Sequence, residues 1–548
     1  KISEELAQML VNRGIQTFSQ AEQFFRPSVK DFLNPFKMLG MYKAVERIKE
    51  AIANKENILI YGDYDVDGTC SVAMMKHFLA TLSTHVCTYQ PHREKEGYGL
   101  SMTAVDWLLK EKISLVITLD CGIKDINAAK KLKQKSIDLI ICDHHNPAEI
   151  LPDAFVILNP KQLDCNYNFK ELCGCGIGLK IIQGYLIHYK ATYDISYAYQ
   201  LAAIATTADV VPLIGENRLI VHLGLLSINT NPISSVKKIW NTYPNLISFN
   251  SADLVFKIAP RINAAGRLAH AKIAVEFLLS ADGEEKSVFS DIESLNKNRK
   301  SLDEDITKEA LFQLSKTPSN RFTNVVYSPN WHKGVIGIVA SRIIEDFYKP
   351  TIVFSGDGDL ITGSARSVKE FDIYDILNQL KHYFIRFGGH KYAAGLTMKR
   401  EILDDFSKDF EKLVADNMSE EVRQKKISID VDLTLEKLFQ NLNKNGVPKL
   451  MRIIKQMEPF GPSNPRPVFC FKKLYFKAPP RIVGQKHIKF LFTDSQQVKH
   501  IGGIWFNSAE KLQKINQLEK ADIVGSVVEN YYNNQMSLQL NIKDVKPS

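Results

Sequence analysis

Short apolar runs alternate with helical stretches between about residues 40 and 230. The runs are rich in Ile, Leu and Val and are bounded by polar or turn residues, as expected of strands buried on both faces of a sheet. Strands that alternate with helices are typical of a parallel sheet wrapped by helices. We therefore expect a doubly wound α/β domain over residues 41–230, with a helix through Ser71–Leu82 after its first strand. The predicted strands are Asn57–Tyr61, Leu115–Leu119, Leu139–Cys142 and Phe155–Leu158.

The pattern changes twice beyond this domain. Residues 285–314 carry apolar side chains at roughly helical spacing among dense charges, which predicts a long helix at the end of a helical connector over residues 231–315. A second α/β pattern covers residues 316–420. Residues 427–548 alternate between apolar and polar with period two, which favours a small antiparallel barrel. The remaining stretch, residues 1–40, is predicted to be a helical segment.

Composition narrows the class of protein. The 548 residues include no run of about 18 apolar residues, and the opening stretch lacks the zones of a signal peptide, so we expect no membrane contact and a cytoplasmic protein. None of the eight cysteines forms a Cys-Xaa-Xaa-Cys pair, which predicts reduced thiols rather than disulfides or a zinc site. A formal net charge of +9 favours a polyanionic partner without identifying it.

Acidic residues and histidines follow the carboxyl ends of the predicted strands. Parallel strands bring those ends to one edge of a sheet, where open α/β folds bind their ligands. We therefore expect one cluster of side chains, to which the end of the apolar segment 201–208 also contributes. Its members are Asp63, Asp65, Asp67, Asp120, Asp143, His144, His145 and Asp209.

The charge of this cluster predicts metal ions. Five aspartates would bring a charge of about −5 into one pocket, and carboxylates at that density cannot all stay ionised. Two divalent cations would offset most of that charge. Oxygen ligands with one or two imidazoles suit Mn²⁺ or Mg²⁺, and a pair of such ions is the usual device for displacement at a phosphodiester. The sequence therefore predicts two Mn²⁺ or Mg²⁺ ions and phosphoryl transfer.

Other interpretations of these residues are weaker. The run Asp63–Gly68 also resembles the start of an EF-hand loop, but the twelfth position is Met74 instead of Glu and a strand precedes it. A single Asp at a strand end is often a helix cap, yet that explanation does not account for several at one edge. The glycine-rich run Cys173–Lys180 fits no phosphate-loop spacing, so we expect a packed turn that starts a helix.

Together these residues resemble the DHH phosphoesterase family, which is named for the triad present here as Asp143, His144 and His145. Further motifs narrow the resemblance to the RecJ-type nucleases of that family, from about residue 40 to the last residue. These motifs are Pro260–Arg267, Trp331–Gly337, Gly388–Gly395 and Glu458–Pro465. The resemblance implies a DHH catalytic domain, a DHHA1-like domain and an OB-fold over residues 41–230, 316–420 and 427–548, respectively.

By the same resemblance, the activity is 5′ to 3′ exonuclease action on single-stranded DNA, releasing 5′-mononucleotides in recombination and repair. Asp63 or Asp65, together with Asp120, would hold one ion, and Asp120 would bridge to the other. His145 would contact the scissile phosphate or the leaving oxygen. The second ion would be held by Asp67, Asp120, His144 and Asp209.

The DHHA1-like domain is expected to bind the phosphates that flank the cleaved bond. Guanidinium groups match phosphate oxygens with paired hydrogen bonds, and hydroxyls or glycine amides complete such sites. Ser364 and Arg366 are the first choice for a terminal 5′ phosphate, whereas Arg261 is equally well explained as a structural ion pair. The substrate-binding candidates are Arg267, Ser364, Arg366, Gly388, Gly389 and His390.

Residues 470–500 combine seven Lys or Arg with one Asp and interleaved aromatic residues, which favours binding of single strands, although such aromatics are more often barrel core. We expect basic residues and only some rings to contact DNA. Two other functions stay open: a DHH phosphodiesterase for short oligonucleotides or cyclic dinucleotides, and a DNA-binding scaffold with a decayed site. Besides single-stranded DNA, the resemblance suggests single-strand binding protein and a helicase as partners of a monomer.

Overall fold

The computed structural model describes residues 2–281, 286–318, 320–444, 446–532 and 535–548. The chain divides into two compact units. The first comprises residues 1–91, 95–259 and 427–548, and the second comprises residues 92–94 and 260–426. Within the described residues no single helix is long and apolar enough to cross a membrane. Helices α9 (Gly215–Thr230) and α10 (Ser234–Asn241) meet the criteria of length and composition only when taken together, and they are bent by 69° relative to each other.

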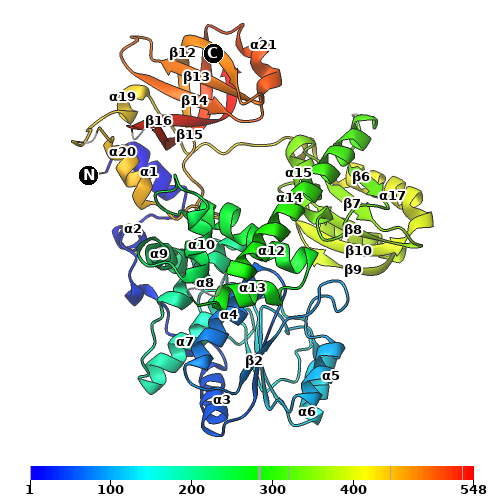
Figure 1. Ribbon diagram of the computed structural model, residues 1–548. Helices are drawn as coiled ribbons and strands as arrows, with labels where there is room; N and C mark the ends of the chain where they lie inside the picture. The colour runs from blue at the N-terminus through cyan, green and yellow to red at the C-terminus, as the bar shows by residue number, and fades with distance from the viewer. Residues whose placement is uncertain (1, 282–285, 319, 445, 533–534) are drawn as a thin grey trace. The chain divides into compact units, whose positions relative to one another are not determined.

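The first unit contains a five-stranded sheet with strand order β2-β1-β3-β4-β5, in which every pairing is parallel. Its strands are β1 (Ile58–Gly62), β2 (Val86–Tyr89), β3 (Leu115–Leu119), β4 (Asp138–Cys142) and β5 (Val156–Leu158). One face carries α3 (Met41–Ala53), α4 (Val66–Ala80) and α7 (Gly174–Tyr189), and the other carries α5 (Met102–Lys110) and α6 (Ile126–Gln134) (Figure 1). The predicted doubly wound α/β fold is confirmed.

Local sequence explains two differences from the predicted elements. The edge strand β2 was not predicted, because its four residues are mostly half-buried and give little apolar signal. Helix α4 begins at Val66 rather than Ser71, because the Asp65 side chain caps it by accepting a hydrogen bond from the Gly68 amide. This early start places the acidic motif inside the first turn of a helix. Helix α8 (Ser196–Ala208) packs on α4 and leads into α9.

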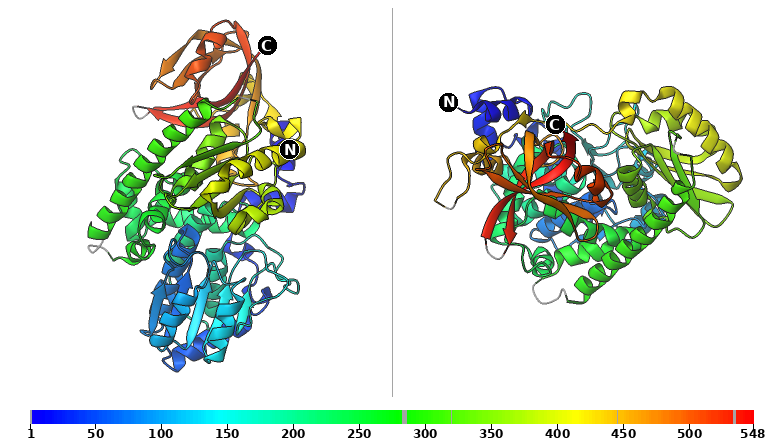
Figure 2. Two further views of the ribbon diagram at one scale, coloured as in Figure 1. Left: turned by 90° about the vertical axis from the view of Figure 1, so that its right-hand side faces the viewer. Right: turned by 90° about the horizontal axis from the view of Figure 1, so that it is seen from above.

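The first unit also contains a closed barrel (Figure 2). Its strands are β12 (Phe469–Val483), β13 (His487–Thr493), β14 (His500–Trp505), β15 (Lys520–Tyr532) and β16 (Gln535–Pro547). The pairing of β12 with β15 closes the barrel, and β14 and β16 are parallel where an antiparallel arrangement was expected. Helix α20 (Lys449–Gln456) precedes it.

The amino-terminal helices α1 (Glu4–Val11) and α2 (Phe18–Phe25) belong to the same unit as the barrel. Leu6, Met9 and Leu10 of α1 are buried in the hydrophobic core that the barrel strands form. Arg13 forms an ion pair of 2.7 Å with Asp430, across 417 residues of sequence. Helix α1 thus completes the core of a domain that is distant from it in sequence.

The second unit is built on a mixed sheet with strand order β6-β7-β8-β10-β9. Its strands are β6 (Asn324–Ser328), β7 (Thr351–Ser355), β8 (Leu360–Arg366), β9 (Phe384–His390) and β10 (Ala393–Lys399). Its helices are α12 (Ala259–Leu268), α13 (Lys272–Leu279), α14 (Lys286–Ser315), α15 (Ile336–Asp346), α16 (Ile373–Gln379) and α17 (Leu403–Asn417). The predicted long helix corresponds to α14 (Figure 1), and Glu285, its expected first residue, lies outside the described residues.

Candidate metal centre

Three aspartates leave the carboxyl end of β1 together. Asp65 caps helix α4, and its Oδ1 accepts the Gly68 N–H at 3.1 Å. Asp67 lies in the first turn of α4, and its carboxylate accepts the N–H groups of Gly174 at 2.6 Å and Cys175 at 2.7 Å. The glycine-rich run therefore starts helix α7, as expected, and its first amides also hold an acidic side chain of the cluster.

Asp120 follows β3 in an unusual backbone conformation. Its φ of 63° lies in the left-handed region, which Asp tolerates better than most residues. The Asp120 N–H donates to the Cys142 carbonyl at 2.9 Å, and its own carbonyl accepts the Tyr98 hydroxyl at 3.1 Å. A Cβ added at Gly174 would lie only 2.6 Å from the Asp120 Cβ. Glycine is therefore needed for α7 to begin this close to Asp120.

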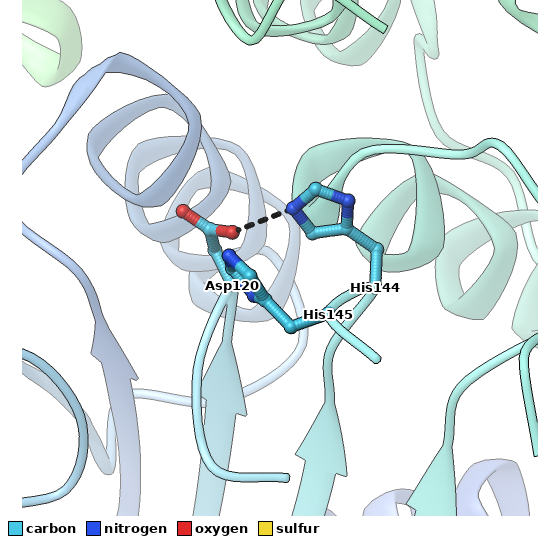
Figure 3. Close-up of side chains that lie close together, drawn as sticks. All are labelled: Asp120, His144 and His145. Atoms are coloured by element: carbon cyan, nitrogen blue, oxygen red, sulfur yellow. Dashed lines mark ion pairs between the residues drawn. The ribbon is translucent and has the colours of Figure 1, made fainter. Parts of the chain in front are cut away.

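His144 lies among three carboxylates. Its Nε2 is 3.2 Å from Asp120 Oδ1, 3.6 Å from Asp209 Oδ2 and 3.9 Å from Asp67 Oδ2 (Figure 3 shows the pair with Asp120). Asp209 comes from the carboxyl end of helix α8 and not from the sheet. The predicted cluster thus draws on the sheet edge and on one helix.

His145 is oriented by Asp143 and Tyr98. Its Nδ1 lies 2.7 Å from Asp143 Oδ1 and 3.0 Å from the Tyr98 hydroxyl oxygen. Asp143 Oδ2 accepts the Ile123 N–H at 2.9 Å. Burial would raise the pKa of Asp143, but hydrogen bonds and the charge of His145 outweigh burial and lower it. Asp143 therefore serves as an ionised support for His145, whose ring lies beside Asp120 (Figure 3).

The cluster offers three sets of ligand atoms, each lying within 4.8 Å of one another. Asp120 belongs to two of them. The sets are Asp63, Asp65 and Asp120; Asp67, His144 and Asp209; and Asp120, His144 and His145. The first set corresponds to one ligand group that the family resemblance implies, and the second set contains the other group without Asp120.

The electrostatics of the cluster fit a cation. Burial, followed by repulsion from neighbouring aspartates, raises the pKa of Asp67 to about 7 and raises the pKa of Asp120 and Asp209 well above the ordinary value. Asp209 Oδ2 is buried and accepts no hydrogen bond from the described residues. Buried carboxylates that repel one another, with an oxygen such as Asp209 Oδ2 that has no donor, are suited to a hard divalent ion. The donor set fits Mn²⁺ or Mg²⁺.

Ser364 and Arg366 lie together in the second unit. Arg366 donates to Ser364 Oγ at 3.1 Å, and a Cβ added at Gly337, beside the start of α15, would meet both side chains within 2.9 Å. Burial, and then the positive charge of Arg93, lower the pKa of Arg366. Two neighbouring guanidinium groups favour an anion. Arg267 instead donates to the Gly334 carbonyl at 3.0 Å.

The remaining candidates of this unit divide into two kinds. Gly388, Gly389 and His390 lie on β9 and are all exposed, and a Cβ added at Gly388 would meet nothing within 4 Å. That part of the sheet is accessible to a ligand. Arg261 forms an ion pair with Glu293 of α14, which supports the structural explanation of that residue.

The barrel separates its charges from its rings. The basic residues between 470 and 500 lie at the surface. Arg481 of β12 and Lys489 of β13 lie opposite each other in the register of the two strands. The rings of Phe471, Phe490 and Phe492 are buried in the core, and Phe476 packs against them. Tyr475, the other ring of this stretch, is half-buried outside that core.

Several contributors were not predicted from sequence. The amides of Gly174 and Cys175 act through the backbone, so no side-chain pattern marks them. Tyr98 and Arg93 lie in an irregular segment without periodic signal. The distance in sequence between Tyr98 and the acidic motifs does not indicate that Tyr98 donates to the Asp120 carbonyl and lies near His145.

Three family descriptions match successive parts of the chain. The DHH family, N-terminal domain, matches residues 57–208, the DHHA1 domain matches residues 321–416, and the RecJ OB domain matches residues 429–544. These matches follow the order of the domains predicted above.

Curated relatives agree with these matches. The chain is 35% identical to the single-stranded-DNA-specific exonuclease RecJ of Bacillus subtilis, over 100% of this chain and 68% of that protein. It is 31% identical to the protein of the same name from Haemophilus influenzae, over 95% of this chain and 93% of the relative.

Solved structures extend the likeness to the fold. The crystal structure of RecJ in complex with Mn²⁺ from Thermus thermophilus aligns with a TM-score of 0.84 at 25% identity, covering 99% of this chain and 76% of that one. The crystal structure of an exonuclease RecJ bound to manganese aligns with a TM-score of 0.61 at 30% identity, covering 71% of this chain and 97% of that one. From its domains, relatives and acidic cluster, the chain belongs to the RecJ family of DHH proteins.

Proposed function

We propose that this chain is a metal-dependent exonuclease that degrades single-stranded DNA from the 5′ end and releases 5′-mononucleotides. The observation that carries this proposal is the cluster of aspartates and histidines at the edge of the parallel sheet, in a chain whose relatives are single-stranded-DNA-specific exonucleases. A decayed scaffold has no need of such mutually repelling, buried carboxylates, because they destabilise the fold when no cation is bound.

Two ions are proposed for the cluster. Asp63, Asp65 and Asp120 would hold one, and Asp120 would also contribute to the second. The other ligands of the second ion would be Asp67, His144 and Asp209. When bound, such a pair supplies an activated water and stabilises charge on the oxygens of the phosphodiester.

His145 is proposed to bind the reacting phosphate and not to be a primary metal ligand. Asp143 Oδ1 lies 2.7 Å from its Nδ1, which fixes the orientation of the ring. Its Nε2 would then interact with a phosphate oxygen or with the leaving oxygen. Asp143 and Tyr98 then act by orienting His145.

The direction of degradation is proposed to depend on the second unit. A metal centre alone does not distinguish the two ends of a strand, so another group must bind the terminal phosphate. Ser364 and Arg366 are supported in this role by their contact and by the nearby charge of Arg93. The accessible face at Gly388, Gly389 and His390 would accept the adjoining backbone.

The basic residues on the surface of the barrel are proposed to bind the rest of the strand. They neutralise phosphates without reading sequence, which suits an enzyme that advances along any strand. A phosphodiesterase for dinucleotides would gain nothing from this domain. Single-strand binding protein and a helicase as partners, and a monomeric state, stay predictions.

The proposed function is tested with Mn²⁺ and end-labelled single-stranded, duplex and dinucleotide substrates. We expect rapid release of mononucleotides from the 5′ end of long single strands and much slower cleavage of the other two. The Asp120→Ala variant, checked for folding by circular dichroism, controls for contaminating nucleases. Preferred cleavage of the dinucleotide would support the phosphodiesterase alternative, and failure of the wild type to cleave any substrate would support the scaffold.

Replacement of Arg366 tests how the end is recognised. Losing a charge-assisted hydrogen bond of about 1.5–3 kcal/mol should lower kcat/KM on 5′-phosphorylated strands roughly 10- to 150-fold. The Arg366→Ala variant should lose much less activity on 5′-hydroxyl strands, so that the two proteins and two strands form a double-mutant cycle. Equal losses on both strands would show that Arg366 does not read the terminal phosphate.

A further inference from the structure

A cavity of about 490 Å³ lies in the first unit, between helix α2, the first turn of α9 and the segment before the barrel. Its volume is within the range of sites for small molecules. Phe24, Phe169 and Ile214 supply apolar walls, and Arg218 supplies a charge. No aspartate or histidine of the candidate metal centre lines it.

Arg218 is buried without a counter-charge. Its side chain forms no ion pair with the described residues, and the residue is only 5% exposed. Nη2 donates to the Glu458 carbonyl at 2.8 Å and to the carbonyls of Gln456 and Met457 at 3.4 Å. The guanidinium lies 4.0 Å from the centre of the Phe24 ring, and Nε donates to no described group. Burial lowers the pKa of Arg218 to about 10, so the group stays charged near neutral pH. A buried, uncompensated cation favours an anionic ligand.

The start of helix α9 adds a second source of positive potential. The helix has 16 residues, and Ile214 before it supplies no side-chain cap. The N–H groups of Gly215 and Glu216 have no hydrogen-bond acceptor among the described residues, and both residues line the cavity. Free amides at the start of a helix are donors aimed out of its end, where anions are stabilised.

Of the other three charged residues in the wall, two form ion pairs. Glu216 pairs with Lys180 and accepts the Tyr167 hydroxyl, and Arg13 pairs with Asp430 at 2.7 Å. Asp31 accepts the Ser28 N–H at 2.7 Å and forms no ion pair with the described residues. Arg218 is thus the cation that, among the described residues of the wall, has no carboxylate partner, and a bound anion would have to approach it rather than Asp31.

We propose that this cavity binds a small organic anion, a phosphate or carboxylate carried on an aromatic or apolar body, with the anionic group at Arg218 and the start of α9. The body would lie against Phe24 and Phe169. The cavity would hold one molecule, and its binding is independent of divalent metal.

Phenyl phosphate is a suitable probe, because it combines both chemistries. Its binding to the full-length protein in EDTA is measured by isothermal titration calorimetry, beside inorganic phosphate and benzyl alcohol. The Arg366→Ala background removes the phosphate-binding candidate of the second unit. We expect saturable binding of one phenyl phosphate, weaker binding of inorganic phosphate, which lacks the ring, and weakest binding of the neutral alcohol.

Two substitutions locate the site. Arg218→Lys keeps the charge but loses the planar fork and should weaken binding about tenfold or more. Ile214→Trp should fill the cavity while leaving Arg218 in place, so it remains informative if the Arg218 variant does not fold. Arg26→Gln, an arginine outside the cavity wall, is the matched control and should bind like the parent.

The outcomes are decisive in both directions. Loss of binding in Ile214→Trp with retention in Arg26→Gln supports the proposal. No saturable binding at millimolar phenyl phosphate, unchanged affinity in Ile214→Trp, or binding that disappears in the Arg366→Ala background alone would each overturn it.

Discussion

Gly174→Ala tests whether the start of helix α7 fixes the geometry of the metal centre. The new Cβ would lie 2.6 Å from Asp120 Cβ and 2.8 Å from Asp120 Cα. Carbon atoms in contact prefer separations of about 3.5–4.0 Å, so α7 and Asp120 must move apart by about 1 Å. Neither side can avoid this by a rotamer change, because the atoms belong to the backbone or are directly attached to it.

The displacement acts on two ligands at once. Asp120 shifts directly, and Asp67 is held by the Gly174 and Cys175 amides at 2.6 and 2.7 Å. Lengthening these contacts by about 1 Å removes hydrogen bonds to a charged group, each contributing about 1.5–3 kcal/mol. We therefore expect Mn²⁺ affinity to fall at least tenfold and kcat/KM on single-stranded DNA to fall about 100-fold.

Gly178→Ala is the matched control, four residues further along the same helix. Its added Cβ would meet the ends of the Met74 and Leu119 side chains, at 3.0 and 3.2 Å, and these can adjust. Mn²⁺ binding by calorimetry, exonuclease rates and circular dichroism are compared for both variants. Folded Gly174→Ala protein with Mn²⁺ affinity and activity within about threefold of Gly178→Ala would falsify the reasoning.

Three further outcomes are expected. Tyr98→Phe removes the hydroxyl that holds the Asp120 carbonyl and lies near His145, and should lower kcat more than it raises KM; an effect on KM alone would contradict this role. Because burial raises the folded-state pKa of Asp67 to about 7 and also raises that of Asp209, the metal-free fold should lose stability as pH rises from about 4 to 7. The Asp209→Asn variant should show a smaller decline in Tm over this pH range than the wild type. An equal decline in Tm in the variant and the wild type would contradict the contribution of Asp209. Arg481→Gln with Lys489→Gln should reduce the slope of log K against log salt for single-stranded DNA by about 1.4, so an unchanged slope would exclude both residues from the DNA contact.

The sheet of the first unit could be predicted from sequence because its strands are apolar and buried on both faces. The bounds of β3 were predicted to the residue, and those of β1, β4 and β5 within one residue. The edge strand β2 is half-buried, so the same rule gives no signal there. Strands buried on both faces could therefore be predicted from their apolar sequence, whereas the half-buried edge strand could not.

The candidate site could be predicted only as far as side chains follow strand ends. Asp63, Asp67 and Asp120 were found in that way, and Asp209 was found although it comes from a helix. The support of Asp67 by backbone amides and of His145 by Tyr98 depends on tertiary packing, which no local pattern records. The barrel rings were ambiguous because alternation fits both a core and a stacking surface.

The packing of α1 into the barrel core has a consequence for synthesis of the protein. Leu6, Met9 and Leu10 leave the ribosome long before the barrel strands that bury them. The partner of Arg13 is made 417 residues later, a delay of about 20–80 s at roughly 5–20 residues per second. During that interval an apolar helix face stays uncovered on a nascent chain, where a chaperone could bind it. Only a chain translated through its barrel can bury this helix.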